Sequence, residues 1–382
     1  MNKIVIIGPV LPYKGGLSHF NTSLINELKK SNDVHVISWK RQYPKIIYPI
    51  ESVEHKDLKY IKNNEMFMLD FYNPFTWFNA VRKIKKINPD LVIFPWVSPI
   101  VSPFYSFILF FIKRNFSTLA ICHNVSQHEE TFLDNFLRKI FFRNVDSFLV
   151  HSRSDYEKLK SLVSNKKIIL GFHPVYDMFK SNSNFNVKNN FRIFFFGYVR
   201  DYKGLIYLLR AMPKILKNLN VKLIIAGEFW ESKKASTNIT TKFVTGKKVI
   251  SRRDYINEIK NLGLNDNVEI IDKYISNEEV GDYFAKSDIL VLPYVSASQS
   301  GPVQVAYNFN IPVIVTNVGG LPDAVIEGKT GYVVEPKNPD SIADAVIKFY
   351  KNNKKGEFVN NIKTFKKKFS WDNYSKLIES LL

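Results

Sequence analysis

Two segments of this 382-residue chain combine glycine with basic residues directly after an apolar run. In the first segment, Gly15 and Gly16 open a predicted helix that follows the short buried strand expected around Ile4–Ile7. Glycine lets backbone amides approach a phosphate or a sugar closely, and the N-terminus of a helix adds positive potential. The segment is typical of phosphate or sugar binding, although a plain turn between a strand and a helix explains it equally well.

The second segment, FFFGYVRDYKG at 194–204, repeats the order of strand, loop and helix. Arg200 and Lys203 lie in its loop, at the carboxyl edge of the predicted strand, where they would neutralise the charge of a bound diphosphate. Cations are also common on protein surfaces, so these two side chains alone leave both interpretations open.

Neither disulfide nor metal chemistry finds support in the sequence. Cys122 is the only cysteine, which excludes a disulfide within the chain and a cysteine-rich zinc site. Its neighbour His123 points to the opposite face of a predicted strand, so Cys122 is expected in the core. Because the sequence has no Asp-x-Asp and no cluster of histidine and cysteine, we predict function without a bound metal. A metal ion held by a single carboxylate stays open as the alternative.

The net charge of +19, from 54 Lys and Arg against 35 Asp and Glu, predicts an anionic partner. The excess is spread evenly, with +10 on residues 1–180 and +9 on residues 181–382, so neither half is a basic tail. The sequence has no zinc-finger spacing and no RNP-like repeat, which argues against nucleic acid. Nucleotide phosphates and an anionic membrane surface fit the charge better.

Residues 91–112 carry no charge over 22 positions, which is long enough for a membrane-spanning helix. Three prolines interrupt this run and favour a buried strand, then a loop, then a helix over Phe104–Lys113. We expect exposed aromatic side chains of that helix to enter a membrane interface, with a spanning helix as the less favoured alternative. The single cysteine fits a reducing compartment, so we expect a cytoplasmic protein bound peripherally to the inner face of the cell membrane.

Short β-branched runs alternate with helical patterns along both halves, which is typical of parallel sheets covered on both faces. In the first half we expect strands at 3–8, 33–38, 90–95, 117–122, 147–151 and 167–170, and helices at 17–30, 75–87 and 131–143. In the second half we expect strands at 191–196, 221–226, 267–271, 289–293, 312–316 and 331–334, and helices at 204–217, 253–261, 277–285, 302–309 and 339–350.

The predicted fold class is therefore α/β, with two Rossmann-like, doubly wound parallel-sheet domains. The Asn-rich stretch 181–190 predicts a linker, which divides the chain into domains at 1–180 and 188–366. A helix at about 367–382 is expected to complete the first domain. Residues 228–252 show no clear periodicity of apolar residues and are expected to form a loop. Such sheets bind ligands outside the carboxyl ends of their strands, so the site is expected in a cleft between the domains.

Six segments together resemble the retaining GT-B glycosyltransferase family 4 over essentially the whole length of the chain. They are the KGG turn at 14–16, ICHN at 121–124, FFFGYVRDYKG at 194–204, LIIAGE at 223–228, IDKYISNEEVGDYFAKSDILVLPY at 271–294 and PVIVTNVGGLPDAVIEGKTGYVVEP at 312–336. The resemblance implies the GT-B fold and a nucleotide diphosphate sugar, of the UDP or GDP type, as co-substrate without another cofactor. It also implies that the C-terminal FSWDNYSKLIESLL crosses back onto the first domain.

Carried over residue by residue, the resemblance implies that Arg200 and Lys203 hold the donor diphosphate and stabilise the leaving group. The backbone near Tyr274 and Ile275 would hold the nucleotide base. His123 matches the family histidine that faces the donor sugar, the alternative being a histidine satisfied by hydrogen bonds inside a loop.

The sequence departs from the family where most members carry a Glu-x7-Glu pair. Residues 296–313 contain no acid, and Val305 or Ala306 takes the place of the second one. Two glutamines and a serine remain as neutral hydrogen-bonding substitutes, and the N-terminus of the following helix can still meet a phosphate. The residues predicted to bind the donor are Gly15, Gly16, Tyr274, Ile275, Gln299, Ser300, Gly301 and Gln304.

These features predict a metal-independent hexosyltransferase that moves a sugar, with retention, to a lipid-linked saccharide acceptor. The expected pathway is bacterial cell-surface polysaccharide biosynthesis, namely lipopolysaccharide O-antigen, capsule or exopolysaccharide. The missing acids keep a second hypothesis open, a catalytically degenerate GT-B subunit that scaffolds an active transferase. A third hypothesis is another GT-B enzyme, such as a nucleotide-sugar epimerase or a phosphorylase.

Overall fold

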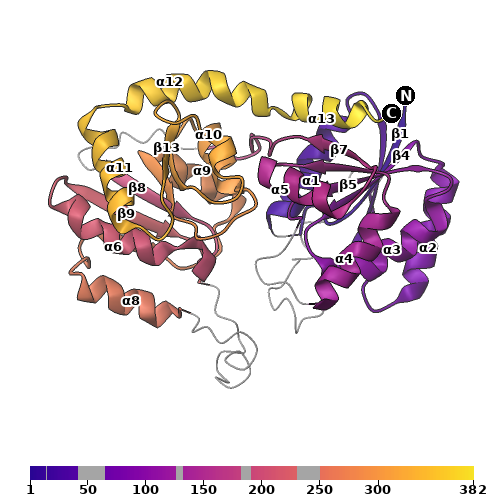
Figure 1. The fold of residues 1–382 in the computed structure, drawn as a ribbon, viewed down its shortest axis with the longest axis horizontal. Helices are drawn as coiled ribbons and strands as arrows, with labels where there is room; N and C mark the ends of the chain where they lie inside the picture. Colours follow the sequence, from indigo (N-terminus) through magenta and orange to yellow (C-terminus); the bar gives the residue numbers. More distant parts are fainter. Residues whose placement is uncertain (14, 42–64, 126–131, 182–190, 230–249) are drawn as a thin grey trace. The chain divides into compact units, whose positions relative to one another are not determined.

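The computed structural model describes residues 1–13, 15–41, 65–125, 132–181, 191–229 and 250–382 (Figure 1). They form two compact units: unit 1 comprises Met1–Pro174 and Phe369–Leu382, and unit 2 comprises Val175–Lys368. Residues 182–190 of the predicted linker and 230–249 of the predicted loop lie outside the described residues.

The units divide at Pro174, earlier than the predicted domain end at 180, because the segment that follows packs on unit 2. The side-chain amide of Asn308 donates a hydrogen bond of 2.9 Å to the backbone carbonyl of Phe179. Ser181 Oγ donates to Asp282 Oδ1 at 3.0 Å.

Unit 1 is built on a seven-stranded parallel sheet with the order β3-β2-β1-β4-β5-β6-β7. Its strands are β1 (Lys3–Ile7), β2 (Asp33–Arg41), β3 (Glu65–Asp70), β4 (Leu91–Trp96), β5 (Ser117–Cys122), β6 (Ser147–Val150) and β7 (Lys167–Leu170). Its helices are α1 (Gly16–Leu28), α2 (Pro74–Ile87), α3 (Ser102–Ile112), α4 (Phe132–Asn144), α5 (Arg153–Leu162) and the C-terminal α13 (Trp371–Glu379).

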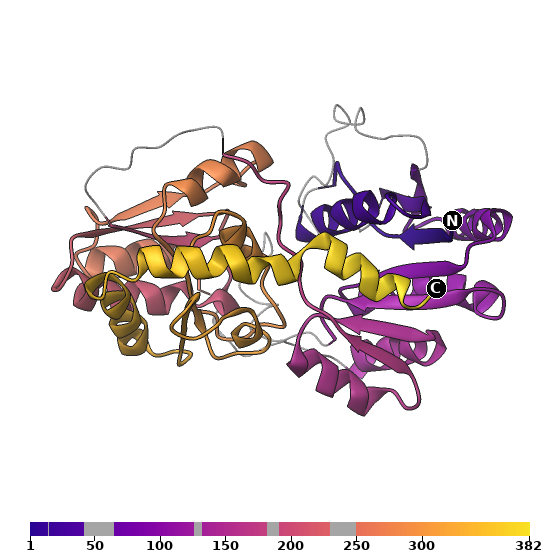
Figure 2. The same ribbon diagram turned by 90° about the horizontal axis from the view of Figure 1, so that it is seen from above.

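Two hydrophobic cores lie on the two faces of this sheet, and alternating residues of β1 supply both. Val5 and Ile7 belong to the core that includes buried residues of α2, α3 and α4. Ile4 and Ile6 belong to the core that includes buried residues of α1 and α13. Successive side chains of a strand point to opposite faces, so burial on both sides explains the continuous apolar run of this strand. Figures 1 and 2 show the helices around the sheet.

The predicted helix over Phe104–Lys113 is confirmed as α3, but the expected exposure holds for only some of its aromatic side chains. Phe104 and Tyr105 are buried in the core beneath the helix, Phe107 and Phe111 are half-buried, and Phe110 is 71% exposed. The cause is that α3 packs its long apolar side against the sheet between α2 and α4. No helix within the described residues is long and apolar enough to cross a membrane.

One strand of unit 1, β3, was not predicted. Its sequence, EMFMLD, contains no β-branched residue, so the composition that marks the other strands is missing. Backbone pairing with β2 at the edge of the sheet defines it instead. The residues before it, 42–64, lie outside the described part of the chain.

Unit 2 is built on a six-stranded parallel sheet with the order β10-β9-β8-β11-β12-β13. Its strands are β8 (Phe191–Phe196), β9 (Val221–Ala226), β10 (Val268–Ile271), β11 (Ile289–Leu292), β12 (Val313–Thr316) and β13 (Gly331–Val334). Its helices are α6 (Leu205–Leu216), α8 (Arg252–Asn261), α9 (Asn277–Ala285), α10 (Gly301–Asn308), α11 (Pro339–Lys351) and α12 (Lys355–Phe365). All predicted elements of this half are confirmed to within one residue at each end, and α12 was missed.

The predicted fold class, α/β with two doubly wound parallel sheets, is confirmed. After α12 the chain returns to unit 1, where Trp371, Tyr374 and Ile378 of α13 are buried in the core beside α1. A cleft between the two domains stays a prediction.

Candidate active site

The strand order of unit 2 reverses between β8 and β11, which are neighbours in the sheet although distant in the sequence. The chain proceeds from β8 to β9 and β10 on one side, and from β11 to β12 and β13 on the other. The loops after β8 and β11 therefore diverge, which in open α/β sheets leaves room for a ligand at the carboxyl edge. Arg200 and Lys203 follow β8, and Gln299 and Ser300 follow β11, so the fold brings predicted residues to both sides of one switch point.

Two glycines fix the loop after β8. Gly197 has a φ of +102°, and a Cβ atom there would lie 2.7 Å from Nζ of Lys203. Gly204 has a φ of +66°, and a Cβ atom there would lie 2.0 Å from the carbonyl oxygen of Pro293, which follows β11. The positive φ strains any other residue at both positions, and at Gly204 the backbone carbonyl of Pro293 also leaves no room for a side chain. This loop conformation places Nζ of Lys203 next to Gly197, at the end of β8.

Lys203 is a buried cation, with 8% of its surface exposed. Burial, and the neighbouring Arg200 cation, lower the pKa of Lys203 to about 7. Its Nζ lies 5.5 Å from the centroid of the Tyr294 ring, and no acidic group of the described residues raises its pKa. A buried charge without a partner is unfavourable, so this arrangement favours a bound anion that would restore the protonated form.

Buried polar atoms without a hydrogen-bond partner among the described residues lie in the loop after β11 and on the first turn of α10. They include Gln299 Oε1 in the loop and Gln304 Oε1 on the helix, whereas the Ser300 hydroxyl interacts with the hydroxyl of Tyr294. Ser300 is the N-cap of α10, but its side chain caps no backbone amide. Buried polar atoms are normally satisfied, so unpaired oxygens at one helix N-terminus indicate a site for a polar ligand. The helix N-terminus itself, which begins at Gly301, favours an anionic one.

The loop after β12 packs against the loop after β11 through backbone contacts. Gly319 has a φ of +52°, and a Cβ atom there would lie 1.6 Å from the carbonyl oxygen of Ala297. The next residue, Gly320, donates a backbone hydrogen bond of 2.9 Å to the carbonyl of Ser298. The paired glycines thus let the two loops touch through their backbones and set the position of the segment that enters α10.

Tyr274 and Ile275 lie in the loop between β10 and α9, at the same carboxyl edge of the sheet. Ile275 is buried, and the half-buried Tyr274 has its ring centroid 6.4 Å from that of Tyr198, which follows β8. The adjacent Ser276 forms a capping box with Glu279 at the start of α9, and this fixes the local backbone. The predicted base-binding segment is thus linked to the β8 loop through Tyr198.

In unit 1 the strand order reverses between β1 and β4. Gly15 is the N-cap of α1 with a φ of +120°, and no atom lies within 4 Å of its Cβ position. The backbone conformation, and not packing, therefore requires this glycine, while the exposed Gly16 begins α1. The side-chain amide of Asn21 holds the preceding loop by donating to the carbonyl of Pro9 at 2.8 Å. Lys14 lies outside the described residues.

His123 directly follows β5 and is 5% exposed. Its backbone N–H donates to the carbonyl of Trp96 at 2.8 Å, whereas its Nε2 has no partner within the described structure. Burial, and the nearby His173, lower the pKa of His123 to about 3, so the imidazole is neutral near pH 7. A neutral ring with an unpaired nitrogen can exchange a hydrogen bond with a ligand hydroxyl.

A buried cluster around His123 was not predicted. Its ring centroid lies 5.0 Å from that of His151, which in turn lies 5.6 Å from that of His173. The ring of Phe20, on α1, contacts all three. A sequence signal did exist, because each histidine follows the end of one of the consecutive strands β5, β6 and β7.

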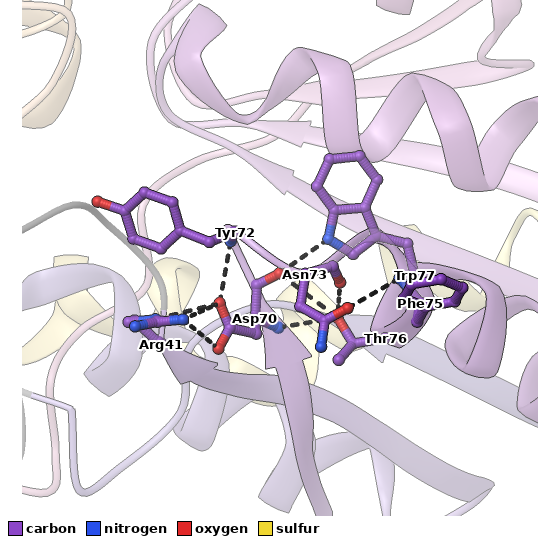
Figure 3. Close-up of polar contacts among 7 residues, drawn as sticks. All are labelled: Arg41, Asp70, Tyr72, Asn73, Phe75, Thr76 and Trp77. Carbon is purple, nitrogen blue, oxygen red and sulfur yellow. Dashed lines mark hydrogen bonds and ion pairs between the residues drawn. The ribbon is translucent and has the colours of Figure 1, made fainter.

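A second cluster at the carboxyl edge of unit 1 was missed together with β3 (Figure 3). Asp70 ends β3 and Arg41 ends β2. The carboxylate of Asp70 accepts hydrogen bonds from Nε of Arg41 at 3.1 Å and from its Nη2 at 2.7 Å. The guanidinium carbon of Arg41 lies 4.7 Å from the centroid of the Tyr72 ring, and the indole nitrogen of Trp77 donates to the Asp70 carbonyl at 2.9 Å. The cluster holds a 55% exposed aromatic ring and a cation in fixed positions.

The described residues contain no group of three or more histidine, cysteine, aspartate or glutamate side chains suited to a metal ion. Function without a metal stays a prediction. Cys122 is fully buried in the core, as predicted, and burial holds the pKa of its thiol well above its usual value.

Comparison with known sequences identifies the family. A sequence model of the family described as Glycosyl transferases group 1 matches residues 178–369, just over half of the chain. This chain belongs to the group 1 glycosyl transferases. The match covers nearly all of unit 2, which carries the buried lysine and the unpaired polar atoms at its switch point.

Relatives in this family match only parts of the chain. An uncharacterized glycosyltransferase of Methanocaldococcus jannaschii is 32% identical over 48% of this chain and 42% of its own length. The D-inositol 3-phosphate glycosyltransferase of Corynebacterium diphtheriae is 29% identical over 40% of this chain and 32% of its own length. The N-acetyl-alpha-D-glucosaminyl L-malate synthase of Bacillus anthracis is 26% identical over 40% of this chain and 34% of its own length. The matched stretch spans less than half of each relative.

Solved structures share the fold over the full length. The Anabaena protein HepE, solved in complex with UDP, has a TM-score of 0.72 at 14% identity and covers 100% of both chains. The lipopolysaccharide outer core galactosyltransferase WaaB has a TM-score of 0.67 at 16% identity, again over 100% of both chains. This likeness confirms the GT-B fold of two Rossmann-like domains.

The positions where the resemblance places the second acid are in the core. Val305 and Ala306, on α10, are 3% and 0% exposed. Gln304, one position earlier, presents the unpaired Oε1 described above. Next to the expected position of the acid, α10 therefore carries the neutral amide of Gln304.

Proposed function

We propose that this group 1 family member is a glycosyltransferase that uses a nucleotide diphosphate sugar, of the UDP or GDP type, as its donor. The observation that carries the proposal is the switch point of unit 2, where the buried Lys203 has no acidic partner among the described residues and the buried oxygens of Gln299 and Gln304 at the start of α10 are unpaired within the same residues. A diphosphate would supply negative charge to Lys203 and Arg200 and accept from the amides of the helix N-terminus. The Anabaena HepE structures with UDP and UDP-glucose support the same ligand class.

In the proposed reaction the bond between the anomeric carbon and the donor diphosphate breaks, and the acceptor oxygen bonds to that carbon. Arg200 and Lys203 stabilise the charge that develops on the leaving diphosphate, which requires no metal ion. The departing phosphate oxygen takes the proton of the acceptor hydroxyl, and attack from the same side gives retention. His123, neutral and with a free ring nitrogen, holds a hydroxyl of the donor sugar.

The proposed acceptor is a lipid-linked saccharide, in the assembly of a cell-surface polysaccharide at the inner face of the cell membrane. The net charge of +19 supports an anionic surface as the working environment. The rigid Tyr72 ring at the carboxyl edge of unit 1 offers an apolar face of the kind on which sugar rings pack. WaaB, a lipopolysaccharide galactosyltransferase of the same fold, is consistent with this pathway.

Thermal unfolding in the presence of nucleotides tests the donor site. UDP or GDP at 100 times its dissociation constant should stabilise the wild type by roughly 2.7 kcal/mol. Arg200→Ala and Lys203→Ala should each lose this stabilisation, whereas Lys217→Ala, at the exposed end of α6, should keep it. The nucleotide that stabilises also identifies the base. If no nucleotide stabilises the wild type, the scaffold hypothesis, which the missing acids motivate, replaces this one.

A further inference from the structure

Exposed large apolar side chains are concentrated on three helices of unit 1. Of the thirteen within the described residues, seven lie on α2, α3 and α4, whereas the whole of unit 2 has only Ile326 and Tyr350. The seven are Phe75, Phe78, Phe110, Phe132, Leu133, Phe136 and Ile140. We call the outer surface of these three helices the aromatic face. Exposed apolar side chains concentrated on one part of a protein surface indicate an interaction site.

The three helices lie side by side over one face of the sheet (Figure 1), so their exposed residues share a surface. The ring centroid of Phe78 on α2 lies 4.8 Å from that of Phe107 on α3. Within α3, the ring centroids of Phe110 and Phe111 are 5.1 Å apart. On the other side, α3 and α4 are joined where Lys113 Nζ donates to Asn144 Oδ1 at 2.6 Å.

The charged side chains at the surface of these three helices are almost all positive. On α2 and α4, six Lys and Arg side chains are not buried, Arg138 is buried, the single acid is Asp134, and α3 has no charged residue. On α2, Arg82 and Lys86 follow Phe78 along the exposed side, and on α4 Lys139 and Arg143 follow Phe136 in the same way. Aromatic side chains next to a basic rim are the composition of surfaces that enter the interface of an anionic membrane.

We propose that the aromatic face docks on an anionic lipid bilayer. The proposal deepens the proposed function, because a lipid-linked acceptor places the reaction at a membrane. Charge complementarity favours lipid over a second copy of this chain, since face-to-face pairing of two copies would bring the same cations against each other. Docking through this face would hold the carboxyl edge of unit 1, where α2, α3 and α4 begin, near the bilayer surface.

Co-sedimentation of the full-length protein with phospholipid vesicles tests this proposal. The wild type should bind vesicles of phosphatidylcholine with phosphatidylglycerol, and bind pure phosphatidylcholine much less. Phe78→Asp with Phe110→Asp should lower binding at least about tenfold, as should Arg82→Glu with Lys86→Glu. Tyr350→Asp and Lys363→Glu, both at exposed positions of unit 2, are the matched controls and should bind like the wild type.

Nucleotide-induced stabilisation, measured on every variant, separates this proposal from the proposed function. If nucleotide stabilises all variants but the aromatic-face variants still bind vesicles, docking is overturned and the donor site stands. If vesicle binding behaves as expected without any nucleotide effect, docking stands and the proposed function fails. A lipid-free dimer that Phe78→Asp with Phe110→Asp dissociates would assign the face to a second copy instead of a membrane.

Discussion

His151 Nε2 lies 2.8 Å from the hydroxyl oxygen of Tyr374, a contact that spans 223 positions of the sequence. It joins the loop after β6 to the C-terminal helix α13, on the face of the sheet where α1 also packs. Because the His151 ring also packs against His123, α13 contributes to the position of the histidine proposed to face the donor sugar.

Tyr374→Phe should therefore cost stability and slow turnover together. The variant keeps the ring in the core but leaves a buried histidine nitrogen without its partner, which costs roughly 1–3 kcal/mol. We expect kcat to fall while KM for the donor stays close to wild type, because the diphosphate is held in unit 2. Urea unfolding and steady-state kinetics measure the two effects, with Tyr350→Phe on the exposed side of α11 as control. An unchanged kcat in a destabilised variant would restrict Tyr374 to a structural role.

The buried histidines predict a loss of stability in mild acid. Burial lowers the pKa of His123 to about 3 and the pKa values of His19 and His173 to about 4, against about 6.5 in the unfolded chain. The unfolded state binds these protons first, so the stabilisation is complete above pH 6.5 and is lost as the pH falls toward 4.

Between pH 7 and pH 5 the free energy of unfolding should fall by about 2 kcal/mol for each histidine that stays neutral in the folded state. Urea denaturation at the two pH values measures this difference. His173→Asn should make the difference in unfolding free energy between the two pH values smaller by about the contribution of one histidine. His35→Asn, on β2 and outside the buried histidine cluster, is the matched control. Equal stability at both pH values would contradict the assignment.

How far the sequence predicts this molecule depends on whether the signal is local. Apart from α12, which was missed, the main helices and strands of unit 2 are predicted to within one residue because amphipathic periods and β-branched runs lie within single segments. The strand β3 was not predicted because its Met, Phe and Leu residues are not β-branched. The Arg41–Asp70 cluster was not predicted either, because Asp70 ends this strand. The histidine cluster forms only because β5, β6 and β7 are neighbours in the sheet, a topology that no local pattern states.

The same contrast applies to the candidate site. The order of strand, loop and helix predicts Arg200 and Lys203 at the carboxyl edge of unit 2, and they lie there. The sequence does not predict that Lys203 is buried or that Gly197 makes room for it, because both depend on how the loop folds against Tyr294. Resemblance to the family identified the residue types, and the structure adds their electrostatic state.

Lys203 should make nucleotide binding depend on pH. Because its pKa is lowered to about 7, the unliganded site loses a proton as the pH rises above 7, and a bound diphosphate should raise the pKa again. Affinity for UDP or GDP should then fall by up to about tenfold for each pH unit between 7.5 and 9.5. Isothermal titration in buffers of different ionisation enthalpy should show proton uptake on binding. Lys203→Arg, which stays charged, should abolish the pH dependence, and its persistence in that variant would exclude Lys203 as its source.

Two glycines of unit 2 form a matched pair for testing the backbone of the donor loop. Gly319→Ala would drive a Cβ atom into the carbonyl of Ala297, whereas Gly328 has a similar φ of +69° and no atom near its Cβ position. Gly328→Ala should therefore cost only the backbone strain of about 1–2 kcal/mol. Gly319→Ala should cost more and also weaken nucleotide binding, because it displaces the segment that enters α10. Thermal unfolding with and without nucleotide measures both effects, and equal costs at the two sites would contradict the close contact.

Gln304 should show opposite effects on stability and on binding. The residue is 2% exposed and its Oε1 has no partner within the described structure, so the unliganded protein carries the cost of a buried unsatisfied polar group. Gln304→Leu removes that group at similar volume and should raise the free energy of unfolding by about 1 kcal/mol, while it weakens nucleotide binding about tenfold or more. Val305→Leu, on the same turn but buried in the core, is the control and should leave nucleotide affinity unchanged. A Gln304→Leu variant that is less stable than the wild type yet binds nucleotide normally would show that Oε1 serves the fold and not the ligand.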